Sequence, residues 1–189
     1  MSELETYISS YFGVPQADLA HIASLFKQTE LKKGECFLKT GKSCNQLSFI
    51  KEGFLRIYVP MEDKEVTQWI STTGYFVTDL SSLIFDTPVR WTIQALTDTQ
   101  LYTISKDDYQ KIGQLIPQWY ELEKLFIAKC FTILEDRIFG HLSMSAEERY
   151  QAFFEKNKEL FNQVPLQYIA SMLGMTPETF SRVRKKSLL

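Results

Sequence analysis

The chain has 189 residues, 44% of them hydrophobic and 23% charged, and its formal net charge is −2. This composition is typical of a globular protein and excludes a largely disordered chain. The sequence has no apolar run near the ~20 residues of a membrane span, and its N-terminus lacks the basic flank and apolar core of a secretion signal, so we expect a cytoplasmic protein without membrane contact.

The cysteines do not indicate a metal site or a disulfide framework. Cys36, Cys44 and Cys130 are odd in number and widely spaced, and the chain has only two histidines, His21 and His141. Neither a CxxC pair nor a cluster of zinc ligands is formed. We therefore expect free thiols and no bound metal.

The first 26 residues are predicted to form two short helices. Apolar side chains recur at helical spacing between Leu4 and Phe12 and again between Leu19 and Phe26. The break between them is Gly13-Val14-Pro15, which a continuous helix would not tolerate.

From Thr29 to about Ser105 the pattern changes to that of strands. Brief runs rich in β-branched and aromatic residues are separated by turn signals such as Glu52-Gly53 and Glu62-Asp63. Strands are expected at 47–50, 54–59, 66–70, 91–96 and 100–104. This spacing predicts a small barrel or jelly roll whose interior could hold a ligand.

Residues 117–142 are predicted to form one long amphipathic helix. Its apolar positions exceed one narrow stripe; they include Trp119, Leu122, Leu125, Phe126, Ile133 and Ile138. This excess favours a second helix packed alongside, and hence a homodimer through the helix 117–142. The alternative is a helix that lies across its own barrel.

A new helix is predicted to begin after Ser145 and to run to about Lys158. Ser145 and Glu148 have the spacing of a capping box, in which each satisfies the other's free amide. A boundary between two domains is expected near 140–145. The chain then divides into an N-terminal domain at 1–115, the long helix at 116–142 and a C-terminal domain at 143–189.

The segment 164–186 has the pattern of a helix-turn-helix. A short apolar helix ends at Gly174, whose missing Cβ permits a left-handed turn. Thr176 can cap the next helix, Pro177 suits its first position, and Phe180 and Val183 would face the first helix.

The second of these helices carries the predicted DNA contacts. Residues 177–189 hold four basic residues against the single acid Glu178. An inserted helix could offer Arg182 to a guanine edge, while the other basic residues bind phosphates. The predicted DNA-binding residues are Thr176, Glu178, Thr179, Ser181, Arg182, Arg184, Lys185 and Lys186. The alternative is a helical hairpin that contacts protein.

On these residues the sequence resembles the Crp/Fnr family of bacterial transcription regulators. The likeness is strongest from Ile169-Ala-x-x-Leu-Gly to Glu-Thr-Phe-Ser-Arg182, and it extends to Leu31-Lys-Lys-Gly-Glu35 and residues 47–58. The resemblance implies an α+β fold: a double-stranded β-helix or jelly-roll sensor, a long dimerisation helix and a helix-turn-helix. It also implies binding to double-stranded DNA, with bases read by Glu178 and Arg182.

Two departures from the family pattern lie in the C-terminal region. Pro177 stands where a polar or basic DNA-contacting residue is frequent. The family's winged hairpin follows the recognition helix, whereas this sequence stops at Leu189, so we expect a domain that lacks a full wing.

The family's ligand cassette matches poorly. Cyclic-nucleotide binders show Phe-Gly-Glu-Leu and then Arg-Ser/Thr-Ala, but this chain has Thr78 at the glycine and Asp79 at the glutamate. Val89 falls on the arginine position and Arg90 lies one residue off, on the other face of an extended segment. The candidate ligand-binding residues are Thr78, Asp79, Leu80, Ser81, Arg90, Trp91 and Thr92. A cyclic nucleotide, another small effector and no ligand all stay open, and the cofactor is unknown.

Two other functional classes compete with this interpretation. A cyclic-nucleotide-binding-like regulatory or scaffold module, whose C-terminal helices bind protein, is the main alternative. A cupin-like metalloenzyme would need histidines within the strands, and residues 29–105 contain none. We therefore expect a protein that is not an enzyme.

Overall fold

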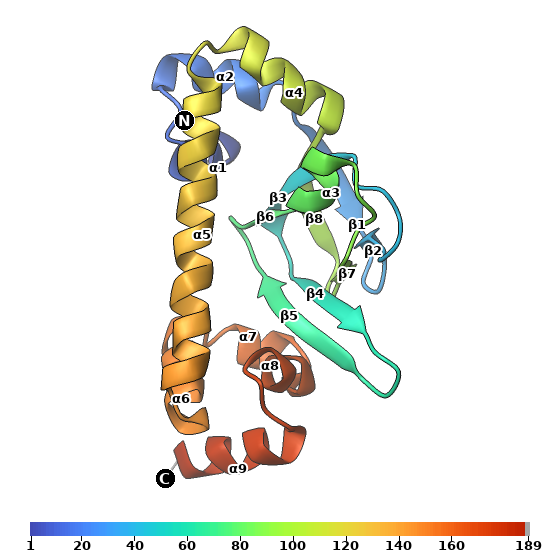
Figure 1. Cartoon of the computed structure of the whole chain (residues 1–189), viewed down its shortest axis with the longest axis vertical. Helices are drawn as coiled ribbons and strands as arrows, with labels where there is room; N and C mark the ends of the chain where they lie inside the picture. Colours follow the sequence, from blue (N-terminus) through green and yellow to red (C-terminus); the bar gives the residue numbers. More distant parts are fainter. Residues whose placement is uncertain (188–189) are drawn as a thin grey trace.

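Two antiparallel sheets, one long helix and a C-terminal group of short helices make up the chain in Figure 1. The computed structural model describes residues 1–187. The predicted ending at Leu189 without a wing, and the last two residues of the domain expected at 143–189, lie outside this range. Among the described residues, no helix is both long and apolar enough to cross a membrane.

The two predicted N-terminal helices are present as α1 (Glu3–Phe12) and α2 (Gln16–Ala23). A capping box between Ser2 and Glu5 starts α1, and Gly13 ends it in a left-handed conformation with φ 68°. Their buried side chains join the barrel core, so these helices close one end of the barrel.

All five predicted strands are confirmed within a few residues. The described strands are β1 (Lys27–Leu31), β2 (Cys36–Leu38), β3 (Gln46–Glu52), β4 (Leu55–Pro60), β5 (Glu65–Ser71), β6 (Phe76–Val77), β7 (Thr92–Ala95) and β8 (Thr99–Ser105). They form two four-stranded antiparallel sheets, with the orders β1-β8-β3-β6 and β2-β7-β4-β5. This arrangement is consistent with the predicted jelly roll. Strands β1, β2 and β6 and the helix α3 (Leu80–Phe85) were not predicted.

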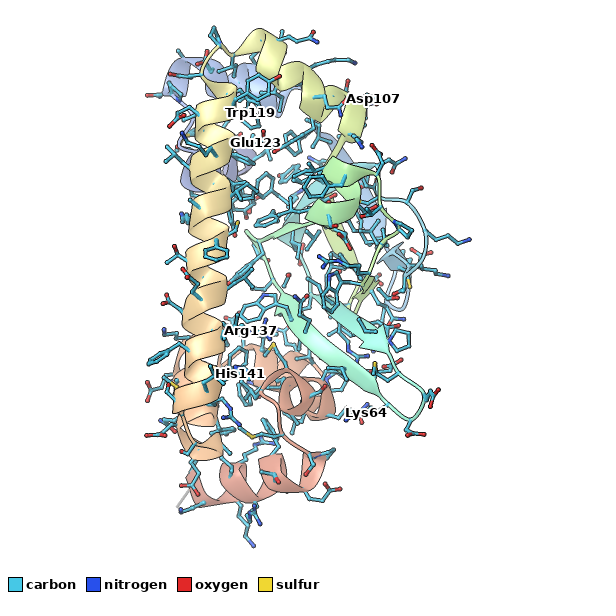
Figure 2. The ribbon with its side chains drawn as sticks, viewed as in Figure 1. Lys64, Asp107, Trp119, Glu123, Arg137 and His141 are labelled. Atoms are coloured by element: carbon cyan, nitrogen blue, oxygen red, sulfur yellow. The ribbon has the colours of Figure 1, made fainter. Side chains whose placement is uncertain are left out.

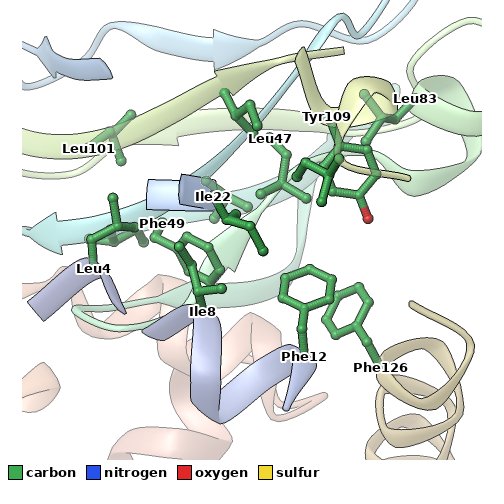
Figure 3. Packing of buried hydrophobic residues seen from close by; sticks show 14 of the residues in the cluster. Leu4, Ile8, Phe12, Ile22, Leu47, Phe49, Leu83, Leu101, Tyr109 and Phe126 are labelled. Carbon is green, nitrogen blue, oxygen red and sulfur yellow. The ribbon is translucent and has the colours of Figure 1, made fainter. Parts of the chain in front are cut away.

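The predicted long helix is present as α5 (Trp119–Ser143), preceded by α4 (Lys106–Leu115). It runs along the left of the molecule in Figure 1, beside the barrel and down to the C-terminal helices. Trp119 and Phe126 are buried, and the Phe126 ring lies 4.4 Å from that of Phe12 on α1 (Figure 3). One face of α5 therefore packs on its own N-terminal domain.

The C-terminal part consists of α6 (Ala146–Lys156), α7 (Leu160–Gln163), α8 (Leu166–Met172) and α9 (Pro177–Ser187). The capping box predicted at Ser145 and Glu148 is formed. These helices share one apolar cluster with Phe54, Ile70 and Leu96 of the barrel. The C-terminal helices therefore pack directly on the barrel and are not connected to it through α5 alone.

Candidate functional site

The helices α8 and α9 are joined by the short turn that the sequence predicted. Gly174 has φ 70°, and the amide of Met175 donates to the carbonyl of Ala170 at 2.9 Å. The Thr176 hydroxyl oxygen accepts from the amide of Thr179 at 3.2 Å and so caps α9. The predicted turn at Gly174 and the predicted cap at Thr176 are therefore both confirmed.

The position of α9 is fixed by packing on α6 and α8. Phe180 and Val183 are buried, and the Phe180 ring lies 5.5 Å from that of Tyr150 on α6. Arg149 of α6 donates to the carbonyl of Leu173 at the end of α8, at 3.1 Å. Sequence reasoning missed this role of Arg149, because an arginine on an amphipathic helix carries no signal for a distant carbonyl.

The face of α9 opposite this packing is exposed and carries four of the eight predicted DNA contacts. Glu178, Arg182 and Lys185 follow at intervals of four and three residues, so they share one face of the helix. Ser181 lies beside them and is also exposed. A charged, solvent-facing stripe thus runs along α9.

The other four predicted contacts differ in exposure. Thr176 is exposed, but Thr179 and Arg184 are half-buried. Lys186 forms an ion pair with Glu147 of α6 at 2.8 Å. Since both partners are largely exposed, this pair is weak and leaves Lys186 free to exchange partners.

Glu178 can only accept hydrogen bonds from DNA, unlike its basic neighbours, which donate them. Hydrogen bonds from its own amide and from Thr176 lower the pKa of the Glu178 carboxyl. The ionised carboxylate only accepts hydrogen bonds, so it suits a base amino group such as that of cytosine better than a phosphate.

The first half of the predicted ligand cassette is occupied by internal hydrogen bonds. Asp79 is buried; one of its carboxylate oxygens accepts from the amide of Ser82 at 3.1 Å, and the other from the amide of Arg90 at 2.9 Å. The Thr78 hydroxyl donates to the carbonyl of Gln46 at 3.0 Å. Leu80 and Ser81, both half-buried, form the first turn of α3.

In the second half of the cassette, neighbouring side chains lie on opposite sides of the chain. Val89 is 2% exposed and belongs to the barrel core, whereas Arg90 is exposed, with its guanidinium 5.7 Å from the centre of the Trp91 ring. The Thr92 hydroxyl lies 3.0 Å from that of Thr40. The arginine position is therefore filled by an apolar side chain.

These residues do not fit a cyclic nucleotide. An arginine is needed to pair with the phosphate charge and a free carboxylate to accept from the ribose, but Val89 is apolar and both oxygens of Asp79 are engaged. Four of the seven candidate residues, Thr78 to Ser81, lead into or begin α3, whereas Arg90 is exposed and does not point inward.

A hollow of about 580 Å³, which the sequence did not indicate, separates the β4–β5 hairpin from the turn between α8 and α9. Lys64 and Val66 line it from the hairpin, and Gln167, Thr176 and Pro177 line it from the helices. Lys64 is labelled at the tip of the hairpin in Figure 2. Because the hollow arises from the docking of two distant segments, no local pattern could have revealed it.

Comparisons with known proteins agree with this architecture. Residues 28–114 match the family model described as "Cyclic nucleotide-binding domain". The structure of FixK2 from Bradyrhizobium japonicum is similar with a TM-score of 0.73 at 18% identity, over 85% of this chain and 83% of that one. The Catabolite Activator Protein of Thermus thermophilus is similar with a TM-score of 0.58 at 19% identity, over 98% of this chain and 86% of that one.

A cAMP-bound structure titled PfPKA-R is also similar, with a TM-score of 0.54 at 18% identity over 58% of this chain. The match spans 40% of that protein's length. No curated protein matches the chain. The chain therefore contains a cyclic-nucleotide-binding domain fold, which it shares with Crp/Fnr-type regulators and with PfPKA-R.

Proposed function

We propose that this protein is a sequence-specific, DNA-binding transcription regulator of the Crp/Fnr type. The observation that carries the proposal is α9, a capped helix whose apolar face is buried on α6 and α8 and whose opposite face presents Glu178, Arg182 and Lys185 to solvent. A helix held in this way can enter the major groove as a rigid body.

The residues of α9 divide into base-reading and phosphate-binding groups. Arg182 can donate two hydrogen bonds to a guanine edge, and Glu178 can accept from cytosine. Lys185, Lys186 and Arg184 supply phosphate affinity that falls with salt, together with the hydroxyls of Thr176, Thr179 and Ser181. The net charge of −2 is consistent with a local interface rather than general polyanion binding.

The regulator would act as a homodimer through α5. Two DNA half-sites about 34 Å apart can be contacted together only if the two α9 helices of the dimer are separated by one helical repeat of DNA. The barrel would bias this spacing, with or without a small effector. In view of the cassette, any effector would be something other than a cyclic nucleotide.

The alternative is a regulatory or scaffold module whose C-terminal helices bind protein. The similarity to PfPKA-R, which bears the barrel fold outside a transcription factor, favours this second candidate. The charged face of α9 is the feature that separates the two candidates.

The test is a gel shift with duplexes selected from a random-sequence pool by the full chain. Arg182→Ala should cost about 1–3 kcal/mol on the selected sequence and relax its preference at one base pair. Lys185→Ala should weaken binding to selected and unselected duplexes equally and flatten the salt dependence. Failure to select any sequence, or an unchanged preference in Arg182→Ala, would contradict the assignment.

A further inference from the structure

Arg56 is the largest fully buried side chain in the described part of the chain, and it lies where the barrel meets α8. Its Nε donates to the Thr67 hydroxyl at 2.9 Å, and its Nη1 pairs with Glu65 at 2.5 Å. These bonds fix the guanidinium plane within the β4–β5 hairpin. A buried cation is costly unless its donors are satisfied, so this geometry is specified rather than incidental.

The guanidinium lies over the rings of two tyrosines, one on β4 and one on α8. The carbon Cζ of Arg56 lies 4.2 Å from the ring centre of Tyr58, on the same strand, and 3.7 Å from that of Tyr168, on α8. Cation–π contacts are strongest where water is excluded, as it is around Arg56. Tyr168 therefore binds α8 to the sensor hairpin.

A second contact uses the edge of the sheet. β5 is the outer strand of its sheet, so alternate backbone groups have no strand partner on that side. The amide of Thr67 donates instead to the hydroxyl of Ser171 on α8, at 2.9 Å. Ser171 lies three residues after Tyr168, so both contacts come from one face of α8.

A third contact joins the same strand to α5. The register between β4 and β5 shifts at Gln68, which leaves this residue as a bulge. Arg137 of α5 donates to the Gln68 carbonyl, and its guanidinium lies 4.8 Å from the ring centre of Trp69. Figure 2 shows Arg137 between α5 and the hairpin. The hairpin is thus tied to both the long helix and the C-terminal helices.

We propose that Arg56, Thr67, Tyr168 and Ser171 form a latch that fixes α9 relative to the barrel, and that opening this latch is how the barrel controls the DNA-binding helices. The inference rests on the proposed function for its regulatory part. Because the hollow described above separates the hairpin tip from the start of α9, the hairpin holds α9 indirectly, through α8. A change in the hairpin would therefore reorient α9 without touching its DNA-facing side chains.

The test compares Tyr168→Leu with Tyr168→Phe in the full chain. Loss of the ring should speed amide hydrogen exchange in α8 and α9 by about tenfold, because a desolvated cation–π contact is lost. Tyr168→Phe keeps the ring, and the Tyr168 hydroxyl is not needed for stacking. Amide hydrogen exchange in Tyr168→Phe should therefore match that of the parent. Unchanged exchange in Tyr168→Leu would overturn the latch.

Two further measurements complete the design. Ser171→Ala removes only the hydrogen bond to β5, so it should speed exchange in α8 even if Tyr168→Leu fails to fold. The affinity of Tyr168→Leu for the selected duplex should change by at least about fivefold, with Tyr168→Phe unchanged. Faster exchange with unaltered affinity would overturn the regulatory role. If the parent selects no duplex, the proposed function fails, and hydrogen exchange alone still decides whether the latch exists.

Discussion

Gly53 marks a position in the barrel where no side chain fits. It joins β3 to β4 with φ 104°, and an added Cβ would lie 2.6 Å from the Thr99 hydroxyl oxygen and 2.8 Å from the Asp98 carbonyl. Gly53→Ala should therefore lose about 2–4 kcal/mol of unfolding free energy, from backbone strain and overpacking together. Urea unfolding followed by tryptophan fluorescence measures this loss.

The matched control is Gly41→Ala. Gly41 also has a positive φ, 81°, but an added Cβ would meet nothing within 4 Å. Gly41→Ala should therefore lower the free energy of unfolding only by the conformational cost of a positive φ, about 1 kcal/mol. Equal losses in the two variants would show that the contact with Asp98 and Thr99 does not matter.

The sequence predicts the placement of some single residues but not of others. Val89 and Arg90 could be assigned to opposite faces because alternation is a local property of an extended segment. Arg56 looked like an ordinary polar position of a strand, and Tyr168 like an ordinary helix residue. Their stacking joins positions 112 residues apart, and no short-range pattern encodes it.

Among the elements, those with strong local signals could be predicted. The capping box at Ser145, the turn at Gly174 and the long apolar period of α5 each gave boundaries within a few residues. The two-residue strand β6 and the six-residue helix α3 were missed, because such lengths carry too little periodicity. The strand β6 is placed by its pairing with β3, and α3 by its N-cap together with the hydrogen bond that the Ser82 hydroxyl accepts from the Cys44 amide.

Asp79 caps α3 and also joins it to the segment before β7 through the Arg90 amide, which makes it a structural residue. Asp79→Ala would leave the buried amide of Ser82 and the partly buried amide of Arg90 without their acceptor, so we expect a loss of about 2–4 kcal/mol of unfolding free energy. Ser81→Ala, which removes an exposed hydroxyl contact with Thr87, should stay within about 0.5 kcal/mol of the parent. Urea unfolding compares the two variants, and a stable Asp79→Ala protein would favour a ligand role for this carboxylate.

At the scale of the whole molecule, an apolar stripe on α5 is left exposed in the single chain. Ile127, Phe131, Leu134 and Ile138 follow at intervals of four, three and four residues, and all are exposed in the single chain. This spacing is that of a coiled-coil seam. Of the apolar positions noted in the sequence, Trp119 and Phe126 are buried and Ile138 lies in this exposed stripe. Ile133 is exposed but lies outside the stripe. Leu125, which the sequence also placed in the excess, lies about opposite the stripe.

A second copy of the chain is the occupant that this stripe fits best, because two such stripes bury each other symmetrically. Phe131→Lys should then shift the protein from dimer to monomer in native mass spectrometry, since a charge in the seam would be buried without a partner. Leu125→Lys is the control, because Leu125 is similarly exposed but points away from the seam. The monomeric variant should also lose binding to a two-half-site duplex, because one α9 cannot span both sites. A dimer that survives Phe131→Lys would place the partner elsewhere and would remove the basis for paired recognition helices.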